Sequence, residues 1–328
     1  MKEILSKLFL NHSLSRQEAK DVFLNIAKSA YNEYQIASFL TVYKMRNVQV
    51  EELLGFRDAL LELAIPVDLS AYNAIDLCGT GGDGKNTFNV STTSAFVVAG
   101  AGVKVAKHGN YGVSSICGSS NVLEHLGYKF TNDPKQLEKQ LDQNNICVLH
   151  APLFHPALKA VGPIRKGFGM SSIFNLLGPM VNPSQPKNQL IGVFHQEVMR
   201  LYKYVYQQLE TRHTIVHSMD GYDEISLTGN VRIVRRTTDS IKSPEDLGFQ
   251  AVLESDIYGG ATVAEAAKIF LSVLENKATN QQKQVVLANS AMAIQASGME
   301  EDYEACVAYA QRSIDSGAAF QCFKKAVG

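Results

Sequence analysis

From residue 73 onward, short apolar runs alternate with segments of helical periodicity, and this alternation restricts the possible folds more than any other feature. The apolar runs are Ala74–Cys78, Val103–Lys107, Ile146–His150, Gln189–Phe194 and Thr214–Ser218. The helical segments are Thr92–Ala101, Ser119–Leu126, Pro134–Gln143 and Glu197–Leu209. Strands that alternate with helices form a parallel sheet with helices on both faces. The sequence therefore predicts an α/β fold with a mostly parallel sheet covered by helices.

The residues before this alternation have only helical patterns. Ser15-Arg16-Gln17-Glu18 matches a capping box, and apolar residues follow it at helical spacing. Two more helices are expected, from about Glu33 to Arg46 and from Val50 to Ala64, before Pro66. The pattern from Ala264 to Val327 is again helical. We predict a small all-helical domain over residues 1–69 and an α/β domain over residues 70–328.

The composition argues against several classes of protein. The chain has 328 residues, 45% of them hydrophobic, and a formal net charge of −1, so no basic surface for nucleic acid is expected. No stretch approaches the ~20 apolar residues of a membrane span, and the N-terminus lacks the apolar core of a signal peptide. The five cysteines are scattered without a Cys-x-x-Cys pair, which favours a reducing cytoplasm over a zinc site or disulfide framework.

The first apolar run ends in a glycine-rich loop, Gly79-Thr80-Gly81-Gly82-Asp83-Gly84-Lys85-Asn86-Thr87. Glycine lets backbone N–H groups approach a ligand, and a helix beginning near Ser91 adds a partial positive charge that suits phosphate. The loop lacks the Walker A pattern and the acidic residue of a dinucleotide site. A tight strand-to-helix turn is the alternative. Asp83 favours phosphate binding, because a carboxylate there suits Mg²⁺ or a ribose hydroxyl.

A second candidate phosphate-binding segment, Lys107-His108-Gly109-Asn110, lies at the end of the next run. Lysine reaches phosphate as a point charge, and Gly109 allows close backbone approach. The residues after it carry four hydroxyl groups, at Ser114, Ser115, Ser119 and Ser120. Ligands of such sheets bind outside the carboxyl ends of the strands, so we expect both segments at one edge.

Candidate metal ligands follow the last run, where Asp220, Asp223 and Glu224 cluster. Mg²⁺ is held by one or two carboxylates plus substrate phosphates, so this cluster is the best candidate for a metal site, although acidic loop residues are commonly just solvated. Arg165 matches a substrate carboxylate in bidentate fashion, or is a surface charge. His150 and His155 are expected to be loop residues that pack near the site.

Together these segments resemble the anthranilate phosphoribosyltransferase family, and the match covers almost the whole chain. Five ordered motifs carry the resemblance, at Asp76–Asp83, Asn89–Ala95, Lys107–Asn110, Phe174–Pro179 and Asp223–Ser226. The resemblance implies transfer of a phosphoribosyl group from phosphoribosyl pyrophosphate to the amino group of anthranilate, in tryptophan biosynthesis. It also implies a homodimer, two Mg²⁺ ions per subunit, and a helical domain completed by about residues 168–185.

The resemblance also implies roles for individual residues. Those expected to hold the sugar donor are Gly79, Gly82, Asp83 and Thr87. Those expected at its pyrophosphate are Asn89, Ser91 and Thr92, with further phosphate contacts from Lys107 and Ser119. The implied metal ligands are Ser91, Asp223 and Glu224. The residues implied beside anthranilate are Arg165, His108 and Asn110, with the backbone of Gly79. Val90, Gly109, Ser114 and Ser115 are also expected to bind substrate. Lys107 and Arg165 are the residues expected to act in catalysis.

The chain departs from the family's pattern at several positions, and two other functions are alternatives. Ser171 stands where the family often has arginine, Ile116 where lysine is common, and Tyr111-Gly112 where Arg-Ala is usual. We expect these changes to alter affinity rather than reaction type. A pyrimidine nucleoside phosphorylase of the same architecture would use free phosphate and carry serine in place of Gly109. A non-catalytic nucleic-acid binder would need a basic groove, which the balanced charge disfavours.

Overall fold

The computed structural model describes residues 1–112, 117–159 and 161–328. Its α-helices are α1 (Lys2–Phe9), α2 (Arg16–Ala27), α3 (Glu33–Met45), α4 (Val50–Leu63), α5 (Val90–Gly100), α6 (Ser119–His125), α7 (Pro134–Asn144), α8 (Ala151–Phe154), α9 (Gly162–Phe168), α10 (Gln196–Gln207), α11 (Val263–Leu274), α12 (Asn280–Ser297), α13 (Tyr303–Asp315) and α14 (Ala318–Val327). Its strands are β1 (Ile75–Gly79), β2 (Val105–Gly109), β3 (Ile146–His150), β4 (Asn188–Gly192), β5 (Arg212–Ser218), β6 (Val231–Arg235) and β7 (Asp239–Lys242).

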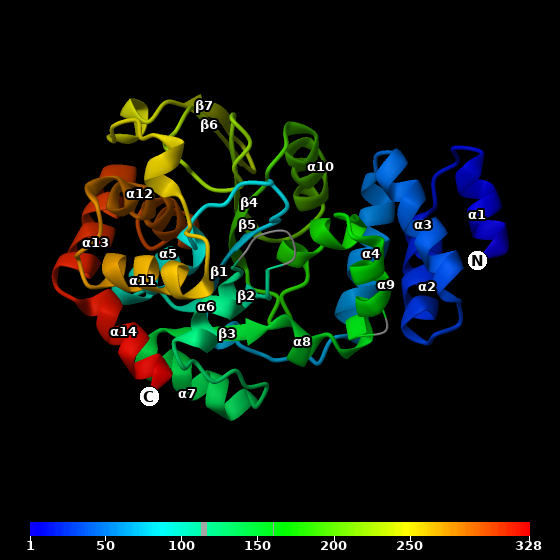
Figure 1. Cartoon of the computed structure of the whole chain (residues 1–328), viewed down its shortest axis with the longest axis horizontal. Coiled ribbons are helices and arrows are strands. Elements are labelled where there is room, and N and C mark those ends of the chain that lie inside the picture. The colour runs from blue at the N-terminus through cyan, green and yellow to red at the C-terminus, as the bar shows by residue number, and fades with distance from the viewer. Residues whose placement is uncertain (113–116, 160) are drawn as a thin grey trace.

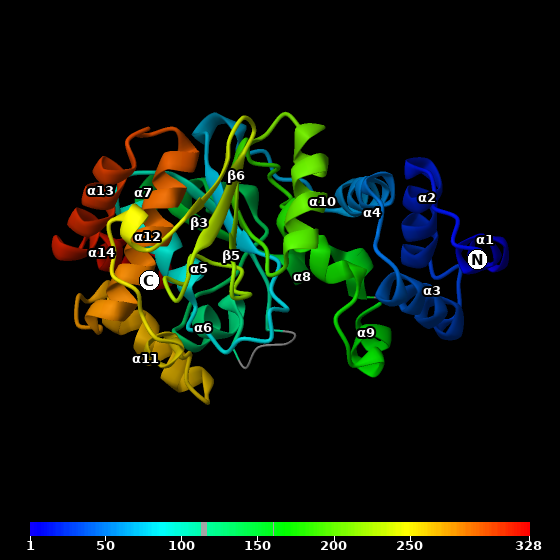
Figure 2. The same cartoon turned by 90° about the horizontal axis from the view of Figure 1, so that it is seen from above.

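The described residues form two lobes side by side (Figure 1). Helices α1–α4 make the helical lobe, with the N-terminus at its outer side, and the sheet with its covering helices makes the larger lobe. Seen from above, α11–α14 cover one face of the sheet, while α10 lies between the other face and the helical lobe (Figure 2). None of the helices in the described ranges combines the length and apolar character that a membrane span requires.

The sheet has the strand order β3-β2-β1-β4-β5-β6-β7. Strands β1 to β5 run parallel, and β6 and β7 add an antiparallel edge. The predicted mostly parallel sheet is thus confirmed, and each of the five apolar runs supplies one parallel strand. The chain proceeds from β1 outward through β2 and β3 and then returns to β4 on the other side. Ligands of such sheets bind outside the carboxyl ends of strands where the order reverses, which here is beside β1.

Two details of the predicted elements were wrong. Strand β2 begins at Val105 rather than Val103, because the Val103 N–H donates to the Val98 oxygen near the end of α5 instead of to a neighbouring strand. The strand then continues through Gly109, so Lys107 and His108 lie within it. The hairpin of β6 and β7 was not predicted, since all four residues of β7 are exposed and show no apolar pattern.

Aromatic rings fill the core of the helical lobe. Phe23 stacks on Phe56 with ring centroids 4.3 Å apart, and Phe39 packs edge-on against Phe56. Phe174, from a distant part of the chain, lies with its centroid 5.0 Å from that of Phe23. The buried side chains of residues 161–181 belong to the same cluster, which continues through Tyr202 of α10 to the sheet. A later segment therefore returns to pack on the N-terminal helices, and α9 lies beside α3 (Figures 1 and 2).

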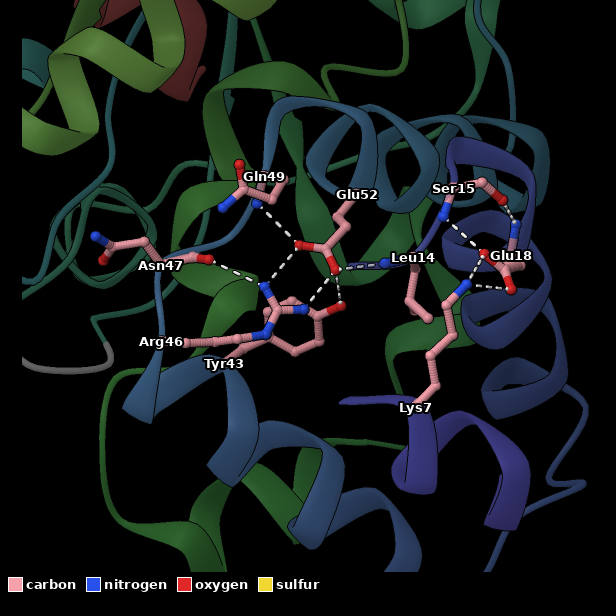
Figure 3. Close-up of polar contacts among 9 residues, drawn as sticks. All are labelled: Lys7, Leu14, Ser15, Glu18, Tyr43, Arg46, Asn47, Gln49 and Glu52. Atoms are coloured by element: carbon pink, nitrogen blue, oxygen red, sulfur yellow. Dashed lines mark hydrogen bonds and ion pairs between the residues drawn. The ribbon is translucent and has the colours of Figure 1, made fainter. Parts of the chain in front are cut away.

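Polar contacts hold the helical lobe together at two glutamates (Figure 3). The capping box is present, because the Glu18 N–H donates to Ser15 Oγ and the Ser15 N–H donates to Glu18 Oε2. Glu52 of α4 is fully buried and accepts from the backbone N–H of Leu14, the Tyr43 hydroxyl and the Arg46 guanidinium. One carboxylate thus joins α4 to α3 and to the loop before α2.

Candidate active site

A cleft of about 270 Å³ lies where the carboxyl ends of β1 and β2 face the segment that returns to the helical lobe. The site residues predicted from sequence that line it are Gly79, Gly82, Asp83, Thr87, Asn89, Ser91, Thr92, Lys107, His108, Gly109, Asn110, Ser119, Arg165, Asp223 and Glu224. Val90, the first residue of α5, is fully buried and does not line the cleft. Ser114 and Ser115 lie outside the described residues.

Asp223 sits against the tips of β1 and β4, and glycine makes this contact possible. The Gly81 N–H donates to Asp223 Oδ2 at 2.7 Å. A Cβ at Gly79 would lie 2.3 Å from Asp223 Oδ2, and one at Gly192 would lie 1.5 Å from the Asp223 backbone oxygen. Any larger residue at either strand tip would therefore displace Asp223 from the glycine-rich loop.

Three carboxylates meet at this point. Asp83, Asp223 and Glu224 each offer an oxygen within 4.8 Å of the other two. Burial and the neighbouring charge of Asp223 raise the pKa of Asp83 to about 7, and burial raises the pKa of Glu224 well above its usual range. Glu224 Oε2 is buried without a hydrogen-bond partner among the described residues. These oxygens fit Mg²⁺, which prefers oxygen ligands and would relieve their mutual repulsion.

Asp220 does not join the carboxylate cluster, contrary to the prediction. Its side chain is exposed and accepts a hydrogen bond from the Thr228 hydroxyl. The turn that begins after Ser218 passes through Gly221, whose φ of 101° is open to glycine and strained for other residues. This turn sends Asp220 away from the cleft and Asp223 into it. The sequence placed Asp83 in the neighbouring loop, and the structure brings it into contact range of the metal-binding candidates.

Several polar atoms of the cleft have no hydrogen-bond partner within the described part of the chain. They include Thr80 Oγ1, Thr87 Oγ1, Asn89 Oδ1 and His108 Nε2, all of them buried. Buried polar atoms are almost always paired with protein, water or ligand. These atoms lie around one cleft, at the amino end of α5, where they can form hydrogen bonds with a polar ligand.

Lys107 and His108 are buried in β2 rather than free at its end. Lys107 is 2% exposed, and its ammonium donates to the Leu77 oxygen at 2.6 Å. His108 Nδ1 lies 3.1 Å from the Gly178 oxygen, so Nδ1 carries the proton and Nε2 is left as an acceptor. Burial, with a smaller effect of His155, lowers the pKa of His108 to about 3. The imidazole is therefore neutral at ordinary pH.

Arg165 faces the cleft from α9. Its guanidinium lies over the Phe174 ring, 5.1 Å from the centroid, and burial lowers its pKa. None of the ion pairs among the described residues includes Arg165. A half-buried guanidinium without a carboxylate partner in the described part of the chain is suited to bind a carboxylate from a ligand.

Of the two histidines expected in a loop near the site, His155 lies outside helices and strands, directly after α8, and lines the cleft as expected. His150 is instead the last residue of β3, and its Nδ1 lies 2.9 Å from Ser120 Oγ. The loop expected between them is the short helix α8, which Pro152 favours in its first turn because its φ is already helical. His155 Nε2 lies 2.9 Å from the Val181 oxygen, which ties this end of the cleft to the returning segment.

Comparison with known proteins agrees along the whole chain. Residues 71–320 match the α/β domain of a glycosyl transferase family, and residues 2–64 match the helical bundle domain of such a family. An anthranilate phosphoribosyltransferase of Flavobacterium psychrophilum is 61% identical over 90% of this chain and 89% of its own. The enzyme of that name from Christiangramia forsetii is 57% identical over 99% of this chain and 98% of its own.

Solved structures give the same result. The anthranilate phosphoribosyltransferase of Thermus thermophilus superposes with a TM-score of 0.91 at 29% identity, covering 98% of both chains. That of Saccharomyces cerevisiae, in complex with phosphoribosyl pyrophosphate and Mg, has a TM-score of 0.90 at 28% identity, covering 98% of this chain and 96% of its own. The resemblance seen in the motifs is confirmed, and the chain belongs to the anthranilate phosphoribosyltransferase family.

Proposed function

We propose that the cleft transfers the phosphoribosyl group of phosphoribosyl pyrophosphate to the amino group of anthranilate. The products are N-(5-phosphoribosyl)anthranilate and pyrophosphate, in tryptophan biosynthesis. One observation carries this proposal: a carboxylate cluster and an unpaired guanidinium line the same cleft. The first suits a metal-bound pyrophosphate, and the second suits the carboxylate of anthranilate. The yeast relative was solved with phosphoribosyl pyrophosphate and Mg, and also with 4-fluoroanthranilate, which supports both substrates.

The proposed metal ligands are Ser91, Asp223 and Glu224, with Asp83 beside them. Bound Mg²⁺ supplies positive charge to the pyrophosphate. Two ions per subunit are proposed, because four oxygen-bearing side chains converge here and Mg²⁺ commonly takes only one or two carboxylates each. The Gly79 loop holds Asp223 in place through the Gly81 N–H, so the loop and the metal ligands form one unit.

The leaving pyrophosphate takes the electron pair of its bond to C1 of the ribose, while positive charge spreads over C1 and the ring oxygen. Lys107 and the residues at the amino end of α5 line the cleft, and we expect their ammonium and N–H groups to stabilise the negative charge that develops on the pyrophosphate. Donors and charges that are fixed before the reaction stabilise such a transition state without reorganisation. Asn89, Thr92 and Ser119 would add polar contacts to the diphosphate.

The proposed acceptor site lies toward the helical lobe. Arg165 would bind the carboxylate of anthranilate and aim its amine at C1. The amine is neutral near pH 7, so a strong general base is not needed. His108 offers Nε2 as a hydrogen-bond acceptor in the same part of the cleft, next to Gly109 and Asn110.

A cytoplasmic homodimer, and a helical domain of residues 1–69 completed by about 168–185, are also proposed. Large exposed apolar side chains on α3, at Tyr34 and Met45, support a protein interface at the helical lobe. The packing of Phe174 on Phe23 supports the discontinuous domain. The scattered free cysteines support a reducing compartment.

The loss of anthranilate fluorescence, with phosphoribosyl pyrophosphate and Mg²⁺ present, tests the proposed reaction. Incubation with free phosphate and a pyrimidine nucleoside, followed by measurement of the released free base, tests the phosphorylase alternative. We expect Asp223→Asn with Glu224→Gln to lower Mg²⁺-dependent turnover at least about 100-fold, because several kcal/mol of charge stabilisation is lost. Asp220→Asn, outside the cleft, is the matched control and should keep its activity. Full activity in the double variant would remove the metal assignment.

A further inference from the structure

The hydrogen-bond ladder between β1 and β2 stops after one residue pair. Strand β1 pairs with β4 through five residues, and β2 pairs with β3 through five, whereas β1 and β2 pair only at Ile75 and Val105. The Ile75 N–H donates to the Lys104 oxygen at 2.9 Å, and no further pair follows among the described residues. The tips of these two central strands therefore separate, although each stays paired on its other side.

Side chains form hydrogen bonds with the backbone groups that β1 and β2 do not pair with each other. In a regular parallel pair, Leu77 would next bond to Ala106 and His108. Instead, the His108 N–H donates to Asp76 Oδ1 at 3.0 Å. The Ala106 oxygen accepts from Asn182 Nδ2 at 2.9 Å. Two polar side chains thus stand between strands that the backbone alone would have joined.

A third side chain completes the opening. The Lys107 ammonium donates a hydrogen bond to the Leu77 oxygen. Asn182 Nδ2 also donates to Asp76 Oδ2 at 2.9 Å. Asp76, Asn182 and Lys107 are 1%, 2% and 2% exposed. Burying a charged carboxylate and an ammonium here costs desolvation energy that a closed ladder with apolar side chains would avoid. Stability alone does not explain the arrangement, whereas a fixed separation of the strand tips does.

We propose that Asp76 and Asn182 are positioning residues, which hold the tips of β1 and β2 apart and thereby set Lys107 and His108 in the cleft. The proposal rests on the proposed function, because it takes Lys107 and His108 as the groups that meet the substrates. Asn182 directly follows Val181, which packs in the core of the helical lobe. Asn182 therefore also links the separated strands β1 and β2 to the segment that carries Arg165.

The test compares two buried asparagines whose side-chain amides each donate two hydrogen bonds. Asn182 donates between β1 and β2, while Asn188 begins β4, is 4% exposed, and donates twice to Asn73. Both Asn182→Ala and Asn188→Ala should lower the melting temperature, and Asn182→Ala should lower it more, because Asn182 Oδ1 also accepts from the Ser184 N–H and hydroxyl. Only Asn182→Ala should lower kcat, by roughly 10- to 100-fold, because a displacement of about 1 Å in a catalytic group has effects of that size.

A binding measurement separates this proposal from the proposed reaction. Calorimetric titration with Mg²⁺ and inorganic pyrophosphate should show about tenfold weaker binding in Asn182→Ala than in Asn188→Ala, because Lys107 is misplaced. Absence of anthranilate turnover in the unaltered protein would overturn the reaction and leave this comparison intact. Equal kcat and equal pyrophosphate affinity in the two variants would overturn the positioning role.

A second variant covers the case in which Asn182→Ala does not fold. Asp76→Asn keeps the size of the side chain and an acceptor for the His108 N–H. It places an amide opposite the Asn182 amide, where both groups donate and neither accepts. We expect the same loss of kcat and of pyrophosphate affinity, at a melting temperature comparable to that of Asn188→Ala. Activity and affinity equal to those of that control would again contradict the proposal.

Discussion

Arg165 illustrates how a single side chain obtains its chemistry from its surroundings. Its guanidinium lies on Phe174, which packs in the core of the helical lobe, and burial lowers its pKa without any paired carboxylate in the described residues. The positive charge of Arg165 is therefore only weakly solvated and can form an ion pair with a ligand. The neighbouring Lys166 has no such position, since it is exposed on the same helix.

We expect Arg165→Ala to raise the KM for anthranilate by at least about tenfold, because the substrate carboxylate loses one charge-assisted bidentate hydrogen-bond pair. The KM for phosphoribosyl pyrophosphate should change little, because Arg165 lies away from the carboxylate cluster. Steady-state kinetics with each substrate varied in turn measures both values. Lys166→Ala is the matched control from the same turn. Equal increases in the two KM values would contradict the role of Arg165.

The pH dependence of stability reports on Asp83. Its pKa of about 7 in the folded protein exceeds the ordinary value because of burial and the charge of Asp223. A raised folded pKa means that its contribution to stability is complete below about pH 4 and is lost as the pH rises through about 7. Asp83→Asn cannot ionise and should avoid this loss.

The melting temperature of Asp83→Asn, relative to the unaltered protein, should therefore increase from about pH 5 to about pH 8. Thermal scans without metal measure the difference, with Asp220→Asn as the control. Added Mg²⁺ and pyrophosphate should remove it, because a bound cation favours the ionised carboxylate. A difference in melting temperature that stays constant with pH would show that the neighbours of Asp83 do not raise its pKa.

The sequence placed most residues of the site but not their orientation. The motifs lie at strand ends, and parallel strands end on one edge, so the convergence of the Gly79 loop with Lys107 follows from pattern alone. Which of two neighbouring carboxylates enters the cleft depends on the turn through Gly221, and the separation of β1 from β2 depends on Asn182, far away in sequence. The Asp220-Gly221 pair indicates a turn but not its direction, and the contact of Asn182 has no local signal.

At the scale of elements, helices with caps were predicted well, because a cap is a local feature. The capping box at Ser15 and Glu18 is an example. The edge hairpin β6–β7 was missed, since the β7 side chains are all exposed and the position of β6, where Val231, Ile233 and Val234 are buried, depends on pairing with β5. Contacts between helices also have no local signal in the sequence. The hydrogen bonds by which Glu52 joins α4 to α3 are an example (Figure 3).

Glu52→Ala should lower the free energy of unfolding by about 3–5 kcal/mol, because it leaves the Arg46 charge and two backbone N–H groups without their buried partner. Glu51→Ala, one residue earlier and exposed, should change it by no more than about 0.5 kcal/mol. Urea denaturation followed by circular dichroism measures both. A cost below about 1 kcal/mol for Glu52→Ala would show that the contacts are replaceable.

At the scale of the whole molecule, two lobes meet at the cleft, and the helical lobe also presents apolar side chains to solvent. Tyr34 and Met45 are 75% and 83% exposed. They are eleven residues apart on α3, which places them on the same side at about 100° per residue. Such side chains on one side of a helix are suited to a contact with a second copy of the chain.

We expect the double change Tyr34→Glu with Met45→Glu to convert a dimer into a monomer, because it introduces charges into that contact. Sedimentation equilibrium over a range of protein concentrations measures the mass. Leu253→Glu, equally apolar and 70% exposed on the larger lobe, is the control and should leave the mass unchanged. A monomer in the unaltered protein would refute the proposed dimer.

The return of residues 161–181 to the core of the helical lobe has a consequence for engineering. A chimera of two relatives joined at a single point near residue 69 would pack Phe23 and Phe56 of one parent against the returning segment of the other. Exchange of the complete lobe therefore requires three junctions, one near residue 69 and one on each side of residues 161–181. Chimeras with a single junction should melt at lower temperatures than chimeras with three.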